Sequence, residues 1–236
     1  MKSKLSKRMQ KAVALVDSTK TYSLSDALQK IKQYSVECST KIDETVELVF
    51  KLGIDPRQTD QAVRGAEVMP SGLGKSVKVA VFVPEEKVDE AKKAGADIAG
   101  SDELIELVKS GKMEDFDICI ATPDMMGKVG LLGKILGPKG LMPNAKLGTL
   151  TPDFAGAIKN VKAGQVSYKN EKGGLVHAGV GKVSFSEDAL KMNIIALYNA
   201  VLRSKPSTSK GIYMRGAYIS TTMGPSIKLD LQTMIG

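Results

Sequence analysis

A regular alternation of short apolar runs and helical segments between residues 76 and 137 constrains the fold more than any other feature. The run "SVKVAVFV" (76–83) is rich in β-branched residues and is bounded by Gly74 and Pro84, which predicts a buried strand. Strands at 97–100 and 116–123 alternate with helices predicted at 85–96, 101–111 and 124–137, the second of them capped by Ser101. Such alternation predicts a parallel sheet in a small three-layer, Rossmann-like α/β domain.

The flanking segments have a different pattern. In "ETVELVFKLG" (44–53) every second residue from Val46 to Leu52 is apolar, which predicts a half-buried strand. Ser23 and Asp26 form a capping-box pattern at a helix start. The elements predicted in the flanks are helices at 4–17, 25–33, 153–164 and 187–203 and further strands at 165–170, 175–185, 211–222 and 226–230. Neither flank has enough elements for a core of its own, so we expect the two together to form one α+β domain.

Charge supports the same division. The chain has a formal net charge of +8 and a pI near 9.3, yet residues 68–158 contain 11 lysines and no arginine against 13 acidic residues. We therefore predict an acidic α/β domain at 68–158, inserted into a basic α+β domain formed by residues 1–67 and 159–236. Clustered positive charge favours a polyanionic partner, because bound lysines and arginines displace the counterions of phosphates.

Several classes of protein are disfavoured. The sequence has one histidine, His177, and none of the common catalytic or metal-binding motifs, so we predict no catalytic residue, no metal and no cofactor. Cys38 and Cys119 lie in unrelated contexts and are predicted to be packed thiols. "GLGKS" (72–76) leads into a strand and lacks the first glycine of a phosphate-binding loop. Without a signal-peptide pattern or an apolar run of membrane-spanning length, the chain is expected in the cytoplasm.

An enzyme remains an alternative at this stage. Asp115, Asp117 and Asp124 are expected to cluster near a strand end, where α/β proteins often place ligand sites. A nucleotide-dependent enzyme with its site among these carboxylates is therefore the competing hypothesis.

The segment "LVHAGVGKVSF" (175–185) favours binding to RNA. In an unbulged strand His177 and the two glycines lie on one face and Lys182 on the other, and the glycines leave the main chain open to close approach. If 165–170 and 175–185 form one hairpin, Lys169, Lys172 and Lys182 make a phosphate-binding edge. A half-buried strand histidine is the alternative for His177.

The segment "STTMG" (220–224) lies where the strand 211–222 ends. Ser220, Thr221 and Thr222 can hydrogen-bond phosphates and ribose 2′-hydroxyls, Met223 can lie on a base, and Gly224 exposes an amide. A plain β-turn is the alternative.

Four segments of the chain resemble the bacterial ribosomal protein L-one family, of the large-subunit stalk. They are "KLGIDPRQTDQAVRGAEVMPSGLGKSVKVAVF" (51–82), "LGPKGLMPNAKLGT" (136–149), "HAGVGKVSF" (177–185) and "ISTTMGPS" (219–226). Their order and approximate spacing match as well. The resemblance implies a two-domain protein that is a monomer when free. It also implies binding to large-subunit rRNA at the mobile stalk, help in releasing deacylated tRNA from the exit site, and repression of its own operon by binding the mRNA.

The resemblance also implies where RNA binds. The family's RNA face matches "KxDET" and "TTMG" here, so the expected RNA-binding residues are Lys41, Thr45, Thr222, Met223 and Gly224, joined by Lys169, His177, Lys182, Ser220 and Thr221. Two positions depart from the family: Ile42 stands where relatives often have Phe, and Gly216 replaces a polar residue of some relatives. Either change is expected to weaken RNA binding without abolishing it. A basic protein that binds any polyanion is the third hypothesis.

Overall fold

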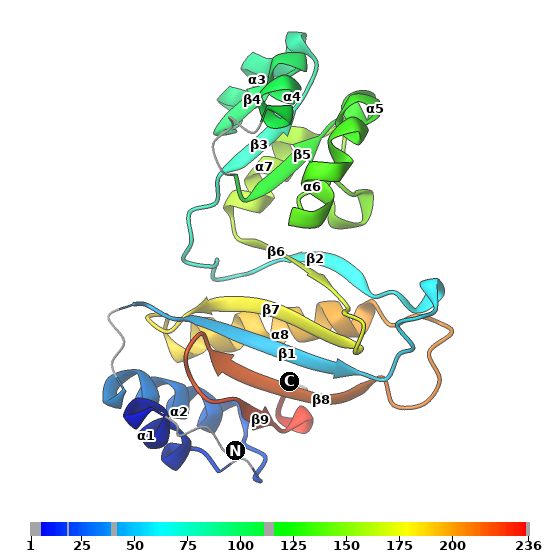
Figure 1. The fold of residues 1–236 in the computed structure, drawn as a ribbon. Helices are drawn as coiled ribbons and strands as arrows, with labels where there is room; N and C mark the ends of the chain where they lie inside the picture. Colours follow the sequence, from blue (N-terminus) through cyan, green and yellow to red (C-terminus); the bar gives the residue numbers. More distant parts are fainter. Residues whose placement is uncertain (1–5, 18, 39–41, 111–115, 235–236) are drawn as a thin grey trace. The chain divides into compact units, whose positions relative to one another are not determined.

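The computed structural model describes residues 6–17, 19–38, 42–110 and 116–234, and the chain divides into two compact units. We call Met1–Gly74 together with Val166–Gly236 the discontinuous unit, and Lys75–Gln165 the inserted unit. Each unit combines helices with a sheet (Figure 1), so the predicted mixed α/β class is confirmed.

A four-stranded antiparallel sheet forms the centre of the discontinuous unit. Its strands lie in the order β7 (Leu175–Lys182), β1 (Thr45–Leu52), β8 (Met214–Thr221) and β9 (Ile227–Leu229). The helices of this unit are α1 (Lys7–Leu15), α2 (Leu24–Glu37) and α8 (Glu187–Arg203). Since β1 is paired on both sides with strands from the other end of the chain, neither flank can form this sheet alone.

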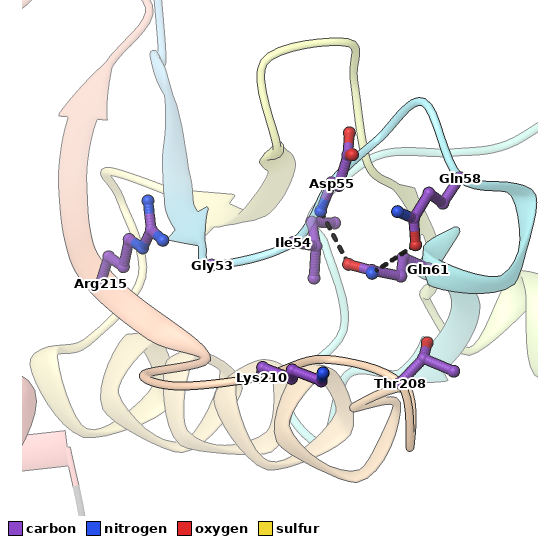
Figure 2. Close-up of a pocket in the computed structure, with 8 residues that line it drawn as sticks. All are labelled: Gly53, Ile54, Asp55, Gln58, Gln61, Thr208, Lys210 and Arg215. Atoms are coloured by element: carbon purple, nitrogen blue, oxygen red, sulfur yellow. Dashed lines mark hydrogen bonds between the residues drawn. The ribbon is translucent and has the colours of Figure 1, made fainter.

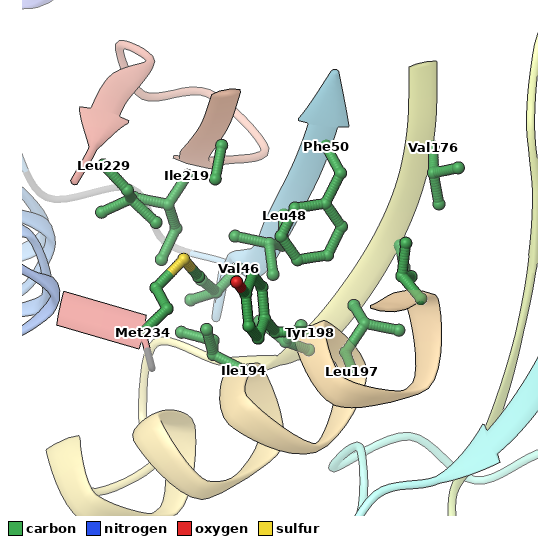
Figure 3. Packing of buried hydrophobic residues seen from close by; sticks show 14 of the residues in the cluster. Val46, Leu48, Phe50, Val176, Ile194, Leu197, Tyr198, Ile219, Leu229 and Met234 are labelled. Carbon is green, nitrogen blue, oxygen red and sulfur yellow. The ribbon is translucent and has the colours of Figure 1, made fainter. Parts of the chain in front are cut away.

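One face of this sheet is apolar and packs against α2 and α8. The side chains of β1 alternate as predicted, with Val46, Leu48, Phe50 and Leu52 buried. Figure 3 shows Phe50 beside Tyr198 of α8, and the two ring centroids are 6.1 Å apart. Burial of each such side chain contributes roughly 1.5–3 kcal/mol, which determines the face of β1 that turns inward.

The opposite face of the sheet carries exposed or half-buried side chains, and we call it the open face. A β-bulge shapes it: Gly181 pairs with Val46 and Gly179 with Glu47, so Val180 is an extra residue in β7. The bulge brings Lys182 to the same face as His177, so the unbulged strand assumed for the prediction of opposite faces is not present. The open face consists of His177, Gly179 and Lys182 on β7, Thr45, Glu47, Val49 and Lys51 on β1, Gly216, Tyr218 and Ser220 on β8, and Lys228 on β9.

The predicted hairpin of residues 165–185 does not form. β6 (Gln165–Lys169) pairs with β2 (Arg64–Val68) in a separate two-stranded sheet, while β7 pairs with β1. Only an isolated bridge between Asn170 and Val176 joins the two segments directly. Alternation of apolar residues indicates that a segment is a strand but not which strand is its partner, and here both partners are distant in sequence.

The two helix starts predicted from serine differ. At the start of α2, Asp26 N–H donates to Ser23 Oγ at 3.2 Å and the Ser23 hydroxyl donates to Asp26 Oδ2 at 2.7 Å, which confirms the cap. Ser101 occupies the cap position of α4 (Asp102–Lys109), but its side chain makes no capping hydrogen bond. Asp102 and Glu103 in the first turn stabilise this helix through its dipole instead.

The inserted unit encloses a parallel sheet of β4 (Ile98–Gly100), β3 (Val79–Phe82) and β5 (Ile118–Ala121), in that order. Its helices are α3 (Val88–Lys93), α4, α5 (Met126–Val129), α6 (Gly133–Lys139) and α7 (Phe154–Lys162). One apolar cluster joins the sheet to α4, α5 and α6, and a second joins it to α3 and α7. Because both faces are covered, the sheet is the middle of three layers.

The inserted unit is shifted along the chain relative to the range 68–158 drawn from charge, since it begins at Lys75 and ends at Gln165. Ile158 and Val161 of α7 belong to the same apolar cluster as Val79 and Val81, so the whole helix lies in this unit. With α7 included, residues 75–165 contain 13 lysines and 13 acidic residues, and the unit is neutral rather than acidic. The discontinuous unit therefore carries the entire net charge of +8.

Within the described ranges, no helix is both long and apolar enough to cross a membrane. The same residues contain no group of three or more His, Cys, Asp or Glu side chains that could hold a metal ion. Cys38 and Cys119 are free and buried, as predicted for packed thiols, and burial raises the pKa of Cys119 to about 12.

Candidate nucleic-acid interface

Three chain segments meet at one end of the four-stranded sheet. They are residues 43–45 at the start of β1, 182–184 at the end of β7, and 221–224 at the end of β8, and we call them the sheet-end cluster. Antiparallel pairing places the beginning of β1 beside the ends of both neighbouring strands, so the three segments meet although they are far apart in sequence.

Thr45 and Thr222 close the sheet at this end. Thr222 N–H donates to Thr45 O at 3.1 Å, and Thr45 N–H donates to Thr222 Oγ1 at 3.1 Å. The Thr222 hydroxyl in turn donates to Thr45 O at 3.4 Å. Since Thr222 is exposed and a hydroxyl has two lone pairs, Oγ1 can still accept one hydrogen bond from outside.

A buried carboxylate positions the turn after β8. Glu44 is only 5% exposed, and its Oε2 accepts a hydrogen bond from Met223 N–H at 3.1 Å. Its main-chain oxygen accepts from Val183 N–H at 3.0 Å, so Glu44 connects all three segments of the cluster. A charge-assisted bond of this kind is among the stronger hydrogen bonds in proteins.

A tyrosine of α2 holds the same turn from the other side. The Tyr34 hydroxyl donates to Met223 O at 3.0 Å. Burial, and secondarily the nearby Glu44 carboxylate, raises the pKa of Tyr34, so the phenol keeps its proton and remains a donor. Both main-chain polar groups of Met223 are thus fixed, while the residue as a whole is 49% exposed.

The position of Gly224 has no room for a side chain. A Cβ there would overlap Thr221 Oγ1 and lie 3.1 Å from the ring of Tyr34. Gly224 N–H donates to Thr221 O at 3.1 Å, which closes a tight turn. The turn predicted from the sequence is therefore present, and it is also part of the candidate interface.

Lys182 is oriented by its neighbours rather than free in solvent. Its ammonium donates to Thr45 Oγ1 at 2.9 Å and to Asp43 O at 3.2 Å. The Asp43 carboxylate accepts from Ser184 N–H at 3.2 Å and from the Ser184 hydroxyl at 2.7 Å. This network places one ammonium group beside the exposed hydroxyls of the cluster.

The structure brings together most, but not all, of the predicted RNA-binding residues. Those that lie in or next to the sheet-end cluster are Thr45, Lys182, Ser220, Thr221, Thr222, Met223 and Gly224. Thr221 is buried, and its hydroxyl has no hydrogen-bond partner among the described residues.

The other predicted residues lie elsewhere. His177 is on the open face, further along β7, and its Nε2 is 3.8 Å from Glu171 Oε2. Lys169 belongs to the separate β2–β6 sheet. Lys41 falls outside the described residues.

The sequence did not predict the residues that position the turn through hydrogen bonds to its main chain. Glu44 lies inside the "KxDET" segment that the resemblance singled out, so its position was marked but its role was not. For Tyr34, 189 positions away from Met223, no signal in the sequence indicates the contact.

The carboxylates of the enzyme hypothesis do not form a site. Asp117 precedes β5 and Asp124 follows it, so they lie at opposite ends of the strand, and Asp115 falls outside the described residues. The Asp117 carboxylate pairs with the Lys75 ammonium at 2.6 Å, and this hydrogen bond is the main cause of its lowered pKa. The ion pair with Lys75 therefore explains the lowered pKa of Asp117 without a catalytic role.

Comparison with known proteins gives a consistent result. The model of the ribosomal protein L1p/L10e family matches residues 26–225. The chain belongs to this family. Large ribosomal subunit protein uL1 of Janthinobacterium sp. (strain Marseille) is 51% identical over 231 residues, covering 98% of both chains. The chain is also similar to uL1 of Mannheimia succiniciproducens, which is 50% identical, with 98% of this chain and 99% of the relative covered. The uL1 of Pasteurella multocida is 51% identical, with 96% of this chain and 97% of the relative covered.

Membership in the L1p/L10e family identifies a structural ribosomal protein rather than an enzyme, so the nucleotide-dependent enzyme is set aside. The match includes β1, β8 and all but the first two residues of α2, the elements that build the sheet-end cluster.

Proposed function

We propose that this protein is a cytoplasmic constituent of the large ribosomal subunit that holds rRNA of the mobile stalk at its sheet-end cluster. Its family and its uL1 relatives support the assembly, and the net charge of +8 on the discontinuous unit supports a polyanionic partner. The inserted unit, which is neutral, is not needed for this contact.

The observation that carries the proposal is the preformed turn of Met223 and Gly224. Glu44 and Tyr34 fix its main chain before any RNA is present, so little conformational freedom is lost on binding. The groups that remain accessible are hydroxyls, the Met223 side chain and one oriented ammonium, whereas the Gly224 amide, expected to be exposed, is occupied by its hydrogen bond to Thr221 O. These groups suit ribose 2′-hydroxyls, bases and phosphates, the features by which RNA is recognised.

The test is fluorescence anisotropy with a labelled stalk rRNA fragment, titrated over a range of salt concentrations beside a scrambled RNA of the same length. The proposal predicts binding that strongly favours the stalk fragment and persists at moderate salt. Equal binding to both RNAs that falls steeply with salt would instead support the general polyanion binder, because only the net charge would then explain the affinity.

We further propose that the protein represses its own operon by binding the mRNA at this same cluster. One site for two RNAs predicts that unlabelled stalk rRNA displaces a labelled leader of the operon mRNA completely and competitively. A ternary complex of protein, rRNA and leader would contradict a shared site.

The proposed help in releasing deacylated tRNA from the exit site rests on family membership, and we assign it to no residue. It predicts that ribosomes assembled without this protein release deacylated tRNA more slowly than ribosomes to which it is added back. Equal release rates would contradict it.

A further inference from the structure

A polar cavity lies at the opposite end of the four-stranded sheet from the sheet-end cluster. It has a volume of about 440 Å³ and is lined by residues that follow β1 and residues on either side of the start of β8. Figure 2 shows its walls, with Arg215 and Lys210 contributed from β8 and the segment before it, and Asp55, Gln58 and Gln61 from the segment after β1. All of these residues belong to the discontinuous unit.

A second β-bulge places Arg215 in the cavity wall. Lys51 pairs with Gly216 and Leu52 pairs with Met214, so Arg215 is the extra residue of β8. Bulges commonly redirect a side chain next to a functional site. The chain packs closely here, since Gly53 N–H donates to Tyr213 O at 2.6 Å and a Cβ on Gly53 would overlap Ile212 O.

Internal hydrogen bonds occupy the amide oxygens of Gln58 and Gln61 and leave an amide donor in the cavity. Gln61 is buried, and its Oε1 accepts from Asp55 N–H at 2.8 Å while its Nε2 donates to Gln58 Oε1 at 2.8 Å. The Asp55 carboxylate accepts from Arg57 N–H at 3.1 Å, and in Figure 2 it points away from Lys210. The amide nitrogen of Gln58 is left as a donor.

Two cations complete the set of donors. Across the described ranges, neither Lys210 nor Arg215 has a hydrogen bond or an ion pair with another side chain, and both are exposed. The Thr208 hydroxyl adds a further group that can donate. An ammonium, a guanidinium, an amide and a hydroxyl around one cavity match the oxygens of a phosphate group, which accept several charge-assisted hydrogen bonds.

We propose that this cavity binds a phosphate group of RNA that lies along the open face of the sheet. The eight residues of β1 separate the cavity from the sheet-end cluster by about 26 Å, at roughly 3.3 Å per residue. On the open face between the two sites Lys51 and Lys228 outnumber the exposed carboxylate of Glu47, so the balance of charge there favours a polyanion. The inference rests on the proposed function, since it adds a second anchor for the same RNA partner.

The first experiment measures the salt dependence of stalk RNA binding for the full-length protein. Replacing Arg215→Gln and Lys210→Gln together is expected to lower the affinity roughly tenfold. The slope of log affinity against log salt is expected to fall in magnitude by about 0.7–0.9, the value for one phosphate contact. The control, Lys92→Gln with Lys93→Gln, removes the same charge from exposed positions of α3 and should leave the slope unchanged.

The second experiment titrates inorganic phosphate into the ¹⁵N-labelled protein and follows the Gly53 amide and the Arg215 Nε–H by NMR. Both signals should shift in the wild type and in the Lys92→Gln/Lys93→Gln control, and the Gly53 signal should not shift in the Arg215→Gln/Lys210→Gln variant. Absence of these shifts in the wild type would overturn the phosphate site.

An unchanged salt slope would overturn the RNA contact, and phosphate binding together with an unchanged slope would assign the cavity to free phosphate instead. Failure of the proposed function looks different: stalk and scrambled RNA would bind the wild type equally. The cavity is tested by comparing the salt slopes of different variants on the same stalk RNA, whereas the proposed function is tested by comparing two RNAs on the wild type. The failure of one proposal can therefore be told from the failure of the other.

Discussion

The discontinuous unit covers its sheet on one face, whereas the inserted unit covers its sheet on both. In β1 only alternate side chains are buried, and the others form part of the open face. In β3 all four residues from Val79 to Phe82 are buried, so the strand has no side chain left for a partner. The charges follow the same division, since the inserted unit is neutral and the discontinuous unit carries +8. From this difference in burial we expect the unit with the alternating strand to bind the partner and the unit with the continuous apolar run to serve as a scaffold.

The largest expected effect comes from Glu44→Ala. It leaves the Met223 N–H without its acceptor and loosens the turn, so we expect the free energy of RNA binding to weaken by about 2–3 kcal/mol. Anisotropy with the stalk fragment measures the affinity, and urea unfolding reports any loss of stability. The matched control is Glu47→Ala, which removes an exposed carboxylate three positions further along and should not weaken binding. If Glu44→Ala and Glu47→Ala bound stalk RNA with equal affinity, the buried carboxylate of Glu44 would have no role in RNA binding.

Gly224→Ala tests whether the turn needs a bare backbone. The new Cβ would overlap Thr221 Oγ1 and press on Tyr34, and we expect stalk RNA affinity to fall roughly tenfold. Gly179→Ala is the comparison on the open face, because its Cβ would be 3.4 Å from Thr45 Cγ2, an ordinary contact. If the Gly224→Ala variant bound stalk RNA as tightly as the Gly179→Ala variant, the shape of the turn would have no role in RNA binding.

Thr222→Val tests whether the Thr222 hydroxyl contributes to RNA binding. The valine cannot accept from Thr45 N–H or from a ribose hydroxyl, so we expect a loss of about 1–2 kcal/mol in RNA binding. Thr222→Ser keeps the hydroxyl and should retain most of the affinity, in the same anisotropy assay. If serine weakened binding as much as valine, the methyl group and not the hydroxyl would be the important part.

The smallest effect concerns the inserted unit alone. The Lys75 hydrogen bond lowers the pKa of Asp117 from its usual 3.8, so this pair stabilises the folded state above that value, and its contribution is lost as pH falls through the lowered pKa. Asp117→Asn should therefore reduce the melting temperature slightly at pH 6, and this reduction should shrink as the pH falls through the lowered pKa. Stalk RNA affinity at neutral pH should be unchanged. A variant with lower RNA affinity would contradict the division between a binding unit and a scaffold unit.

Local patterns in the sequence predicted the elements of both units. The alternation from Val46 to Leu52, the cap formed by Ser23 and Asp26, and the continuous apolar run of β3 each reflect contacts within one element. Features that depend on distant contacts were not predictable in the same way. At the bulge, Asn193 Nδ2 of α8 donates to Val180 O at 2.7 Å, a contact between distant segments that no pattern within β7 reveals.

The candidate site likewise contains some residues that the sequence predicted and others that it did not. Exposed groups such as Thr222 and Met223 could be predicted, because their chemistry suits RNA and the resemblance marked them. The groups beneath them could not, since Glu44 and Tyr34 become partners of Met223 only when β1, β8 and α2 are assembled. The end of the inserted unit was misplaced for a similar reason: the apolar stripe of α7 shows that the helix packs, but not on which sheet.

The most direct test of the central claim is an NMR titration of the ¹⁵N-labelled protein with the stalk rRNA fragment. We predict that the amide signals of Thr45, Lys182, Met223 and Gly224 shift or broaden first, and that the signals of β3, β5 and α7 in the inserted unit stay in place. Changes confined to the inserted unit, or spread evenly over every lysine-rich surface, would contradict a specific RNA interface at the end of the four-stranded sheet.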